Sequence, residues 1–449
     1  MKTKLVLAIS NMASVLLFAS ISNAAIVTAT GSGNWSSITP DAPWPGGVGP
    51  GPTDSVVVNT PFNVTVDTNE SVENLSGSGT VTMGTNAELD IVGANGGDGA
   101  YALANFIATA TGNTVNYQGN AYQMNYTNYY NLIWSGYGGP YATTPFTVLN
   151  DFTMNNISTT GQAGGGGGTT VGHNWTIGPG SYWDISCEPA SVAGNLIISG
   201  SFNIGCGSGS IASFNNVTVN SGGTFNLGDT ARATISGNFT NNGTVVGTSY
   251  AQFNMTGTGS ISGTSTVTVP VLEITGTTIL SNSVSSTHSP TLNGTIEFDL
   301  ATPASVTVAG TIYENDTLTV INSSPTAPVT GTTYQLFNAT GYNFPYSVFS
   351  ATNLPALPAG LSWVTALNTA GTISVTGTAT GGGGAPTLSI VAGGGNATLS
   401  WDSTTFPGFS VQKNTTGLGS TNWVNTGSGT VSPYITPLTT NKVFFRLVN

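Results

Sequence analysis

The chain has 449 residues, of which 5% are charged, and its formal net charge is −12. A sequence this poor in lysine and arginine cannot neutralise many phosphate groups, which argues against nucleic acid and anionic membrane surfaces as partners. Its 61 glycines are typical of disorder, but 39% of the residues are hydrophobic and recur regularly, and the mixture of glycine with β-branched residues disfavours long helices.

The first 24 residues have the pattern of a secretory signal peptide. Two lysines near the start precede an apolar run at residues 15–18, and Ser22 and Ala24 are spaced for cleavage before Ala25. The apolar run is too short for a membrane anchor. We therefore expect a secreted protein, extracellular or on the cell surface, with no membrane insertion of the mature chain.

Residues 25–290 consist of short glycine-bounded phrases that recur at about 19 to 23 residues. The clearest are GTVTMG at 79–84, GSFNIG at 200–205 and GTFNLG at 223–228, each an alternating strand between turn glycines. An antiparallel sandwich would also have short, evenly spaced strands. The recurrence of whole phrases favours a right-handed parallel β-solenoid, in which each coil buries its apolar face against its neighbours.

The two cysteines end phrases of the same kind. SYWDISC at 181–187 and GSFNIGC at 200–206 align at an offset of 19 residues, which gives Cys187 and Cys206 the same position in consecutive coils. Equivalent residues of adjacent strands lie about 4.8 Å apart, within the range that a disulfide spans. In an oxidising compartment we expect a Cys187–Cys206 disulfide, and two buried free thiols are the alternative.

Aromatic residues are concentrated between residues 117 and 141. Exposed rings in this stretch could stack on sugar faces, and tyrosine hydroxyls could add hydrogen bonds. The alternative is that the rings fill the solenoid core or form ladders between coils. The candidates for glycan stacking are Tyr122, Tyr126, Trp134, Tyr137 and Tyr141.

Groups that could carry catalysis are scarce. From residue 25 to residue 412 the only basic side chain of arginine or lysine type is Arg232, which is too little for a uronate lyase. A glycoside hydrolase needs two carboxylates around the scissile bond. The candidates on strands are Asp184, Glu273, Glu297 and Asp299. The last two share one strand face, for which a solvated surface is the simpler interpretation. We predict no enzyme, no catalytic residue and no cofactor.

No metal site is predicted either. His173 and His288 are the only histidines, and they lie far apart in the sequence beside turn residues, without a second ligand at useful spacing. Oxygen ligands for calcium cluster at residues 95–99 and 67–71, but neither stretch repeats with the period of a calcium-binding β-roll, so plain turns are favoured.

Several phrases resemble secreted bacterial β-solenoid surface proteins. They are GSGNWSS at 31–37, VENLSGSGTVTMGTNAELDIVG at 72–93 and TVNYQGNAYQMNYTNYYNLIWSGYG at 114–138. YQLFNATGYN at 334–343 and GTISVTG at 371–377 resemble the end of the passenger-like region in autotransporter-like proteins of the Verrucomicrobia type, so residues 291–378 are expected to form that β-rich end. The resemblance implies a structural or adhesive role at the cell surface.

The last part of the chain differs from an autotransporter, which ends in a long membrane barrel. Residues 379–387 form a glycine-rich linker, and residues 388–449 alternate as short strands that end in a Phe-Phe-Arg-Leu phrase. This tail is similar to small fibronectin-like or Ig-like β-sandwiches.

These observations lead to one expectation with one alternative. We expect a secreted structural or adhesive protein of the cell surface or extracellular matrix, without catalysis, whose partners are polysaccharides or cell-surface components and not nucleic acid. The alternative is a carbohydrate-binding or polysaccharide-degrading β-helix protein.

Overall fold

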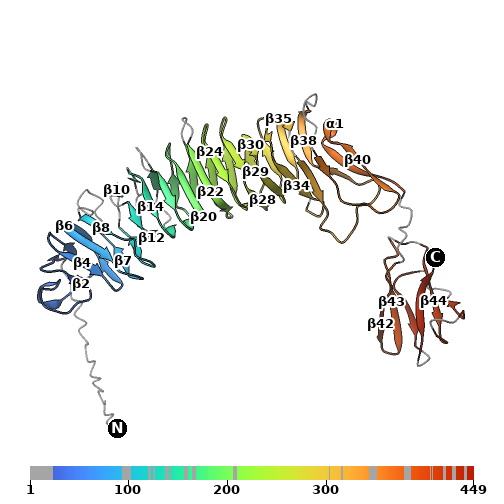
Figure 1. Ribbon diagram of the computed structural model, residues 1–449, viewed down its shortest axis with the longest axis horizontal. Coiled ribbons are helices and arrows are strands. Elements are labelled where there is room, and N and C mark those ends of the chain that lie inside the picture. The colour runs from blue at the N-terminus through green and yellow to red at the C-terminus, as the bar shows by residue number, and fades with distance from the viewer. Residues whose placement is uncertain are drawn as a thin grey trace, which may run out of the picture. The chain divides into compact units, whose positions relative to one another are not determined.

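A computed structural model describes residues 24–448 apart from 94–102, 120–122, 125–126, 137–140, 143, 156–159, 164–167, 206–209, 303, 315–316, 343–350, 379–385, 405, 407, 418–420, 427–430 and 439–441. The protein is nearly all β, with 2% helix, and its stacked parallel strands form a β-solenoid of about 11 turns (Figure 1). The predicted parallel solenoid is confirmed, and the antiparallel sandwich is wrong for the main body. In the described part of the chain, no helix is long and apolar enough to cross a membrane.

The chain divides into two compact units, of which the first is mainly Met1–Gly205. Its parallel strands belong to three sheets. The first sheet contains β1 (Ile26–Thr28), β2 (Gly33–Asn34), β3 (Ser55–Val57), β4 (Asn63–Val66), β6 (Asn74–Met83) and β8 (Leu103–Ile107). The second contains β5 (Glu70–Val72), β7 (Glu88–Ile91), β9 (Thr114–Tyr117), β11 (Asn128–Tyr129), β12 (Asn131–Trp134), β14 (Phe146–Val148), β15 (Phe152–Met154), β17 (Thr169–Val171), β18 (Trp175–Ile177) and β20 (Ala190–Ile198). The third contains β10 (Gln123–Met124), β13 (Tyr141–Ala142), β16 (Thr160–Ala163), β19 (Tyr182–Asp184) and β21 (Ser201–Ile204).

The second unit is mainly Ser213–Ser221 and Phe225–Asn449. Two strands, β22 (Ile211–Val219) and β23 (Thr224–Leu227), contain residues of both units. Its further coils contain β24 (Arg232–Ile235), β25 (Phe239–Asn241), β26 (Thr244–Gly247), β27 (Gln252–Met255), β28 (Thr258–Gly263), β29 (Val267–Val269), β30 (Val271–Ile274), β31 (Thr277–Leu280), β32 (Val284–Ser286), β33 (Thr291–Leu292), β34 (Thr295–Asp299), β35 (Val306–Glu314), β36 (Thr317–Ile321), β38 (Phe337–Tyr342) and β39 (Ala351–Asn353). The parallel pairing therefore continues past residue 290, since β34 pairs with β36 and β36 with β39.

Side-chain alternation explains why these short segments are strands. In β12, Leu132 and Trp134 point inward and are fully buried, whereas Asn131 and Ile133 are half-exposed. The parallel pairing of β12 with β15 places Leu132 beside Phe152, so inward residues meet inward residues in the next coil. Each coil thereby buries an apolar face that it could not bury alone.

The solenoid core of the first unit is rich in aromatic rings. Phe152 stacks on Trp175 with ring centroids 5.2 Å apart, and Trp183 lies against Trp175 edge to face at 5.3 Å. Phe202 completes the group at 5.2 Å from Trp175. All four side chains are fully buried, and edge-to-face and offset geometries are the favourable ones for aromatic pairs.

A pair of tryptophans holds the beginning of the described chain together. Trp35 and Trp44 are buried with ring centroids 4.7 Å apart, and the Trp44 indole N–H donates to the Trp35 carbonyl oxygen at 2.7 Å. Next to them, Asp67 at the end of β4 accepts hydrogen bonds from Ser36: the backbone N–H at 3.0 Å and the hydroxyl at 2.6 Å. The segment before β3 is thus tied to the first coils by both packing and a carboxylate.

This carboxylate predicts a pH dependence. Burial alone would raise the pKa of Asp67, but the hydrogen bonds from Ser36 outweigh it and hold the pKa below its usual value of 3.8. A carboxyl whose pKa is lower in the folded than in the unfolded state stabilises the fold above the unfolded value, and that stabilisation is lost as the pH falls through the folded value. We expect the free energy of unfolding to fall less steeply below about pH 4 in Asp67→Asn than in the wild type, measured by urea titration at several pH values.

The Ser36→Ala variant serves as the matched test, because it removes the hydroxyl donor and keeps both the carboxyl and the Ser36 backbone N–H. It should flatten the acid dependence in part, and adding it to Asp67→Asn should flatten the dependence no further. If the free energy of unfolding falls with acid in both single variants as it does in the wild type, Asp67 does not cause this pH dependence.

The coils of the second unit end in a small antiparallel sheet. It contains β37 (Thr333–Gln335), β40 (Leu361–Ala366) and β41 (Thr372–Gly377), and the short helix α1 (Leu367–Ala370) connects the last two strands. Gly371 ends α1 with a φ of 66°, a left-handed conformation that suits glycine. Its carbonyl oxygen accepts the N–H groups of Leu336 and Phe337, each at 3.0 Å, which joins this sheet to the start of β38.

The tail forms two three-stranded antiparallel sheets. One contains β42 (Ser389–Gly393), β43 (Asn396–Ser400) and β46 (Tyr434–Pro437), and the other contains β44 (Ser410–Asn414), β45 (Val424–Asn425) and β47 (Phe444–Val448). Leu399 and Trp401 from the first sheet region share one apolar cluster with Val411 and Leu447 from the second. The tail thus consists of two small antiparallel sheets that share one apolar cluster. Most of the predicted linker, residues 379–385, lies outside the described chain.

Candidate functional site

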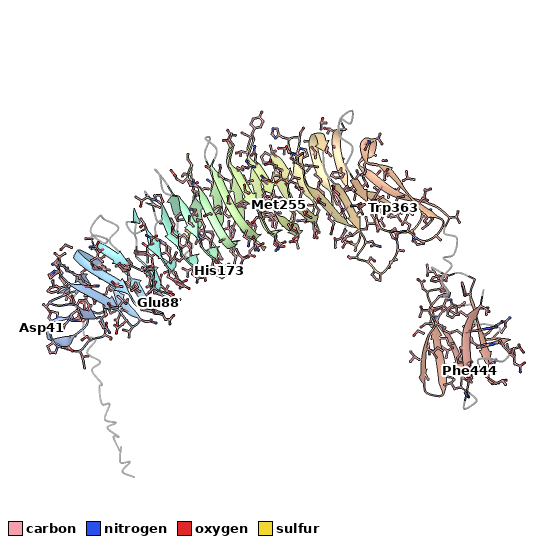
Figure 2. The ribbon with its side chains drawn as sticks, in the orientation of Figure 1. Asp41, Glu88, His173, Met255, Trp363 and Phe444 are labelled. Carbon is pink, nitrogen blue, oxygen red and sulfur yellow. The ribbon has the colours of Figure 1, made fainter. Side chains whose placement is uncertain are left out.

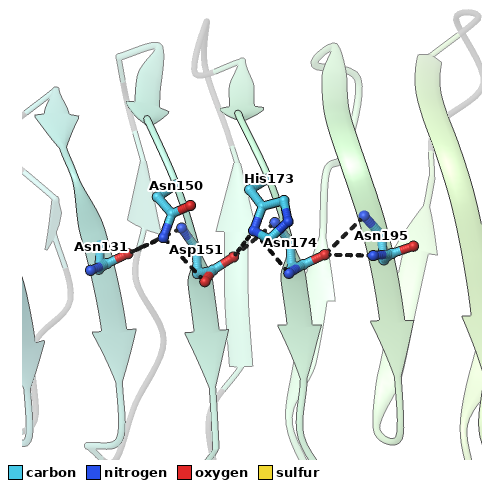
Figure 3. Close-up of polar contacts among 6 residues, drawn as sticks. All are labelled: Asn131, Asn150, Asp151, His173, Asn174 and Asn195. Atoms are coloured by element: carbon cyan, nitrogen blue, oxygen red, sulfur yellow. Dashed lines mark hydrogen bonds and ion pairs between the residues drawn. The ribbon is translucent and has the colours of Figure 1, made fainter. Parts of the chain in front are cut away.

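The most regular surface feature of the first unit is a column of polar side chains along successive coils (Figure 3). Four coils present a triplet whose middle residue is buried and whose first and third residues lie on the outer face. The triplets are Asn131-Leu132-Ile133, Asp151-Phe152-Thr153, Asn174-Trp175-Thr176 and Asn195-Leu196-Ile197. The parallel registers align the middle residues, so the first residues form one column and the third residues another.

The first column is a hydrogen-bonded ladder. The side-chain oxygen of Asn131 accepts the backbone N–H of Asp151 at 3.3 Å, Asp151 accepts that of Asn174 at 3.0 Å, and Asn174 accepts that of Asn195 at 3.2 Å. The second unit has the same device, because Asn216 accepts the N–H of Asn238 at 2.8 Å. Each step satisfies a backbone donor where the coil turns into the next strand.

Asp151 is the one acidic member of the ladder in the first unit, and it carries a histidine beside it. Its carboxylate lies 2.9 Å from Nδ1 of His173 and also accepts from the Asn150 side chain at 3.2 Å. A carboxylate-oriented imidazole is one part of an acid–base catalytic group. In the described residues, however, both polar contacts of the ring are made by Nδ1, which either donates to Asp151 at 2.9 Å or accepts from the Asn174 side-chain nitrogen at 3.0 Å, and neither partner is a serine, threonine or cysteine. The pair thus continues the ladder rather than completing a nucleophilic site.

Removal of one ladder amide has a predictable cost. Asn174→Ala leaves the Asn195 N–H without its acceptor, and we expect a loss of about 1–2 kcal/mol in the free energy of unfolding. Thr176→Ala on the same face is the matched control, since the described residues contain no side-chain hydrogen bond of Thr176, and it should cost much less. Chemical denaturation measures both losses. Equal losses in the two variants would mean that the hydrogen bond from the Asn195 N–H to Asn174 contributes little to stability.

The aromatic cluster belongs mainly to the core. The expectation that Trp134 stacks on a glycan is wrong, because its side chain is fully buried and its ring lies 4.9 Å from that of Tyr117. Tyr117 and Tyr129 are also buried, and their hydroxyl oxygens lie 3.1 Å apart. Among the other candidates, Tyr122, Tyr126 and Tyr137 lie outside the described residues, as does the side chain of Tyr141, whose backbone begins β13.

Of the four candidate carboxylates, Asp184, Glu273 and Asp299 have a hydrogen-bond or ion-pair partner. Glu273 on β30 accepts from Arg232 on β24 at 3.1 Å. Asp184 accepts the Ser186 N–H at 2.7 Å and the Tyr182 hydroxyl at 3.3 Å, and burial together with this carboxylate raises the pKa of Tyr182.

Glu297 and Asp299 lie on the outer face of β34, as the alternation predicted. Asp299 accepts the N–H groups of Ala301 and Ser323, each at 3.0 Å, and the Ser323 hydroxyl. Burial alone would raise the pKa of Asp299, but the Ser323 hydrogen bonds outweigh it and lower the pKa. A glycosidase acid needs the opposite shift.

The described residues contain no group of three or more His, Cys, Asp or Glu side chains that could hold a metal ion. His173 lies between β17 and β18 and His288 between β32 and β33, and His288 contacts the ring of Tyr250 with centroids 5.0 Å apart. Of the two calcium candidates, residues 95–99 lie outside the described chain, and in residues 67–71 the Asp67 carboxylate is bound to Ser36.

The cysteine register agrees with the sequence offset. β19 pairs with β21 in parallel, with Trp183 opposite Phe202 and Asp184 opposite Asn203. Cys187 lies in the turn after β19, and the described residues contain no free cysteine. Cys206 lies outside the described chain, so the disulfide stays a prediction.

The ladder was not predicted, although the sequence contains its pattern as triplets of Asn or Asp, an apolar residue, and Thr or Ile, one coil apart. Comparison of the chain with models of protein families, with curated proteins and with solved structures finds no match.

Proposed function

We propose that this chain is a secreted structural or adhesive protein of the cell surface or extracellular matrix and that it catalyses no reaction. The observation that carries the proposal is the use of its carboxylates. Glu273 is paired with Arg232, Asp299 is bound by Ser323, and Asp151 supports the polar ladder. Groups committed to such contacts serve coil stacking, and this use of the carboxylates supports a role without catalysis.

The surface chemistry supports the same role. In the four ladder coils the outer columns consist of asparagine, threonine and isoleucine with the single carboxylate of Asp151, which give a face of repeated geometry and little charge. Such a face suits contact with neutral polymers or with other surface components rather than with nucleic acid. The leader-like first residues and the resemblance to the passenger-like regions of Verrucomicrobia-type autotransporter-like proteins are part of this proposal.

Cell fractionation tests the location. We expect the chain in the medium or on the outer surface, accessible to added antibody on intact cells, with Ala25 as its first residue. A chain found in the cytoplasm with its leader intact would overturn the proposal.

A reducing-sugar assay on a panel of polysaccharides tests the absence of catalysis. No turnover is expected from the wild type. Turnover that disappears in Glu297→Gln, with Glu88→Gln on the outer face of β7 as the control, would establish a hydrolase instead.

A further inference from the structure

A cavity of about 200 Å³ lies in the second unit where β34 meets β37 of the antiparallel sheet. Phe298 and Leu336 are buried and form its apolar base, while Asp299, Ser305 and Thr333 supply polar groups. The volume is below the roughly 300–1,000 Å³ of pockets that take drug-sized ligands, so the cavity suits a single small ring. An apolar base with a few polar groups is typical of binding pockets.

Tyr334 supplies an aromatic side to this cavity. Its ring lies against Trp363 (labelled in Figure 2) with centroids 6.1 Å apart, and the Trp363 indole N–H is fixed on the Pro355 carbonyl oxygen at 2.8 Å. The described residues provide no hydrogen-bond partner for the Tyr334 hydroxyl, and burial raises the pKa of this group. A positioned ring with an unused hydroxyl can contact both the apolar face and a hydroxyl of a ligand.

Asp299 is fixed by three hydrogen bonds and still has an unused acceptor position. A carboxylate has about four acceptor positions, and three are used by the Ala301 N–H, the Ser323 N–H and the Ser323 hydroxyl. One acceptor position remains, on the oxygen that the Ser323 hydroxyl also contacts. Hydrogen bonds to a carboxylate are stronger than those between neutral groups, so this position favours a hydroxyl donor and repels an anionic ligand.

We propose that this cavity binds one neutral pyranose unit, with the apolar face of the sugar on Tyr334 and a sugar hydroxyl on Asp299. The inference rests on the proposed adhesive function and names its ligand class. A free monosaccharide and the terminal unit of a surface glycan share this chemistry, and the negative charge of Asp299 disfavours uronic and sialic acids.

The probes are the methyl glycosides of glucose, galactose, mannose and N-acetylglucosamine, with methyl glucuronide as the acidic counterpart, measured on the full chain by saturation-transfer NMR and calorimetric titration. We expect at least one neutral glycoside to bind, and the glucuronide to bind at least about tenfold more weakly. Tyr334→Ala should weaken binding about tenfold or more because it removes the stacking surface.

Thr333→Trp covers the case in which Tyr334→Ala fails to fold. Thr333 is exposed, so a larger side chain there obstructs the cavity without disturbing the core, and binding should be lost. Tyr250→Ala is the matched control, because Tyr250 is 65% exposed and does not line the cavity; binding should be unchanged. The inference is wrong if no glycoside binds or if Thr333→Trp binds as well as the wild type.

Pull-down on insoluble polysaccharides separates the two ligand sources. Retention that depends on Thr333 and is competed by the bound methyl glycoside identifies the glycan terminus, whereas glycoside binding without retention identifies the free sugar. Surface location of the Thr333→Trp variant should match the wild type. If no sugar binds but the chain remains at the surface, the cavity inference fails and the proposed function stands.

Discussion

Trp175→Ala is expected to lower the free energy of unfolding by about 3–5 kcal/mol. The indole is fully buried and contacts the rings of Phe152, Trp183 and Phe202, so its removal leaves a cavity among rings that cannot close around it. Its N–H has no hydrogen-bond partner in the described structure, so the loss comes from packing alone. Urea denaturation measures the change.

Trp175→Phe is the matched control, because it keeps a ring at the position and removes the unsatisfied N–H. It should cost less than about 1.5 kcal/mol. In Trp175→Ala, amide hydrogen exchange should accelerate most in β15 and β20, the strands that pair with β18. The reason is that each coil of a solenoid is stabilised mainly by its nearest neighbours. Equal losses in the two variants would mean that ring packing at this position carries little energy.

Loss of the Cys187–Cys206 disulfide is the second large effect expected. A loop of about twenty residues gives a stabilisation of roughly 3 kcal/mol in the chain-entropy model, reduced by any strain in the folded state. Cys206→Ser should therefore lower the unfolding midpoint and loosen β19 and β21, while coil stacking preserves the fold elsewhere. Denaturation under oxidising and reducing conditions measures the loss, and the variant should behave alike in both.

Peptide mapping of the non-reduced protein tests the bond itself. Pepsin suits this experiment because it works at low pH, where thiolate attack on disulfides is suppressed. We expect one linked pair of peptides that contains both cysteines. Two thiols that alkylate freely in denaturant without reductant would refute the bridge, although the pairing of Trp183 with Phe202 would remain.

Local periodicity made most of the fold predictable. Alternation within each phrase and recurrence between phrases identified parallel coils, and the offset of the cysteine phrases matched the pairing of β19 with β21. The burial of Trp134 was also available from the sequence, because it is two residues from Leu132 and therefore shares its face. The concentration of aromatic residues suggested sugar stacking, but the position of Trp134 on the same strand face as Leu132 was the stronger indication.

The cavity could not be predicted in the same way. It depends on Asp299 at the end of a parallel strand meeting Tyr334 on an antiparallel one, and no repeat relates these two residues. The hold of Ser323 on Asp299 is equally remote in sequence, at a separation of 24 residues. Repeats determine which residues stack, whereas the end of a repeat array brings together side chains that have no common period.

The pairing of Arg232 with Glu273 has a consequence for resistance to proteolysis. Trypsin-like peptidases need a lysine or arginine, and between residues 25 and 412 Arg232 is the one such residue. It begins β24, its backbone pairs with Gln252 of β27, and its side chain is held by Glu273 of β30. Cleavage there requires several coils to open first, since a protease must bind an extended, released segment. The scarcity of basic residues between residues 25 and 412 thus predicts slow cleavage of this region by trypsin-like peptidases.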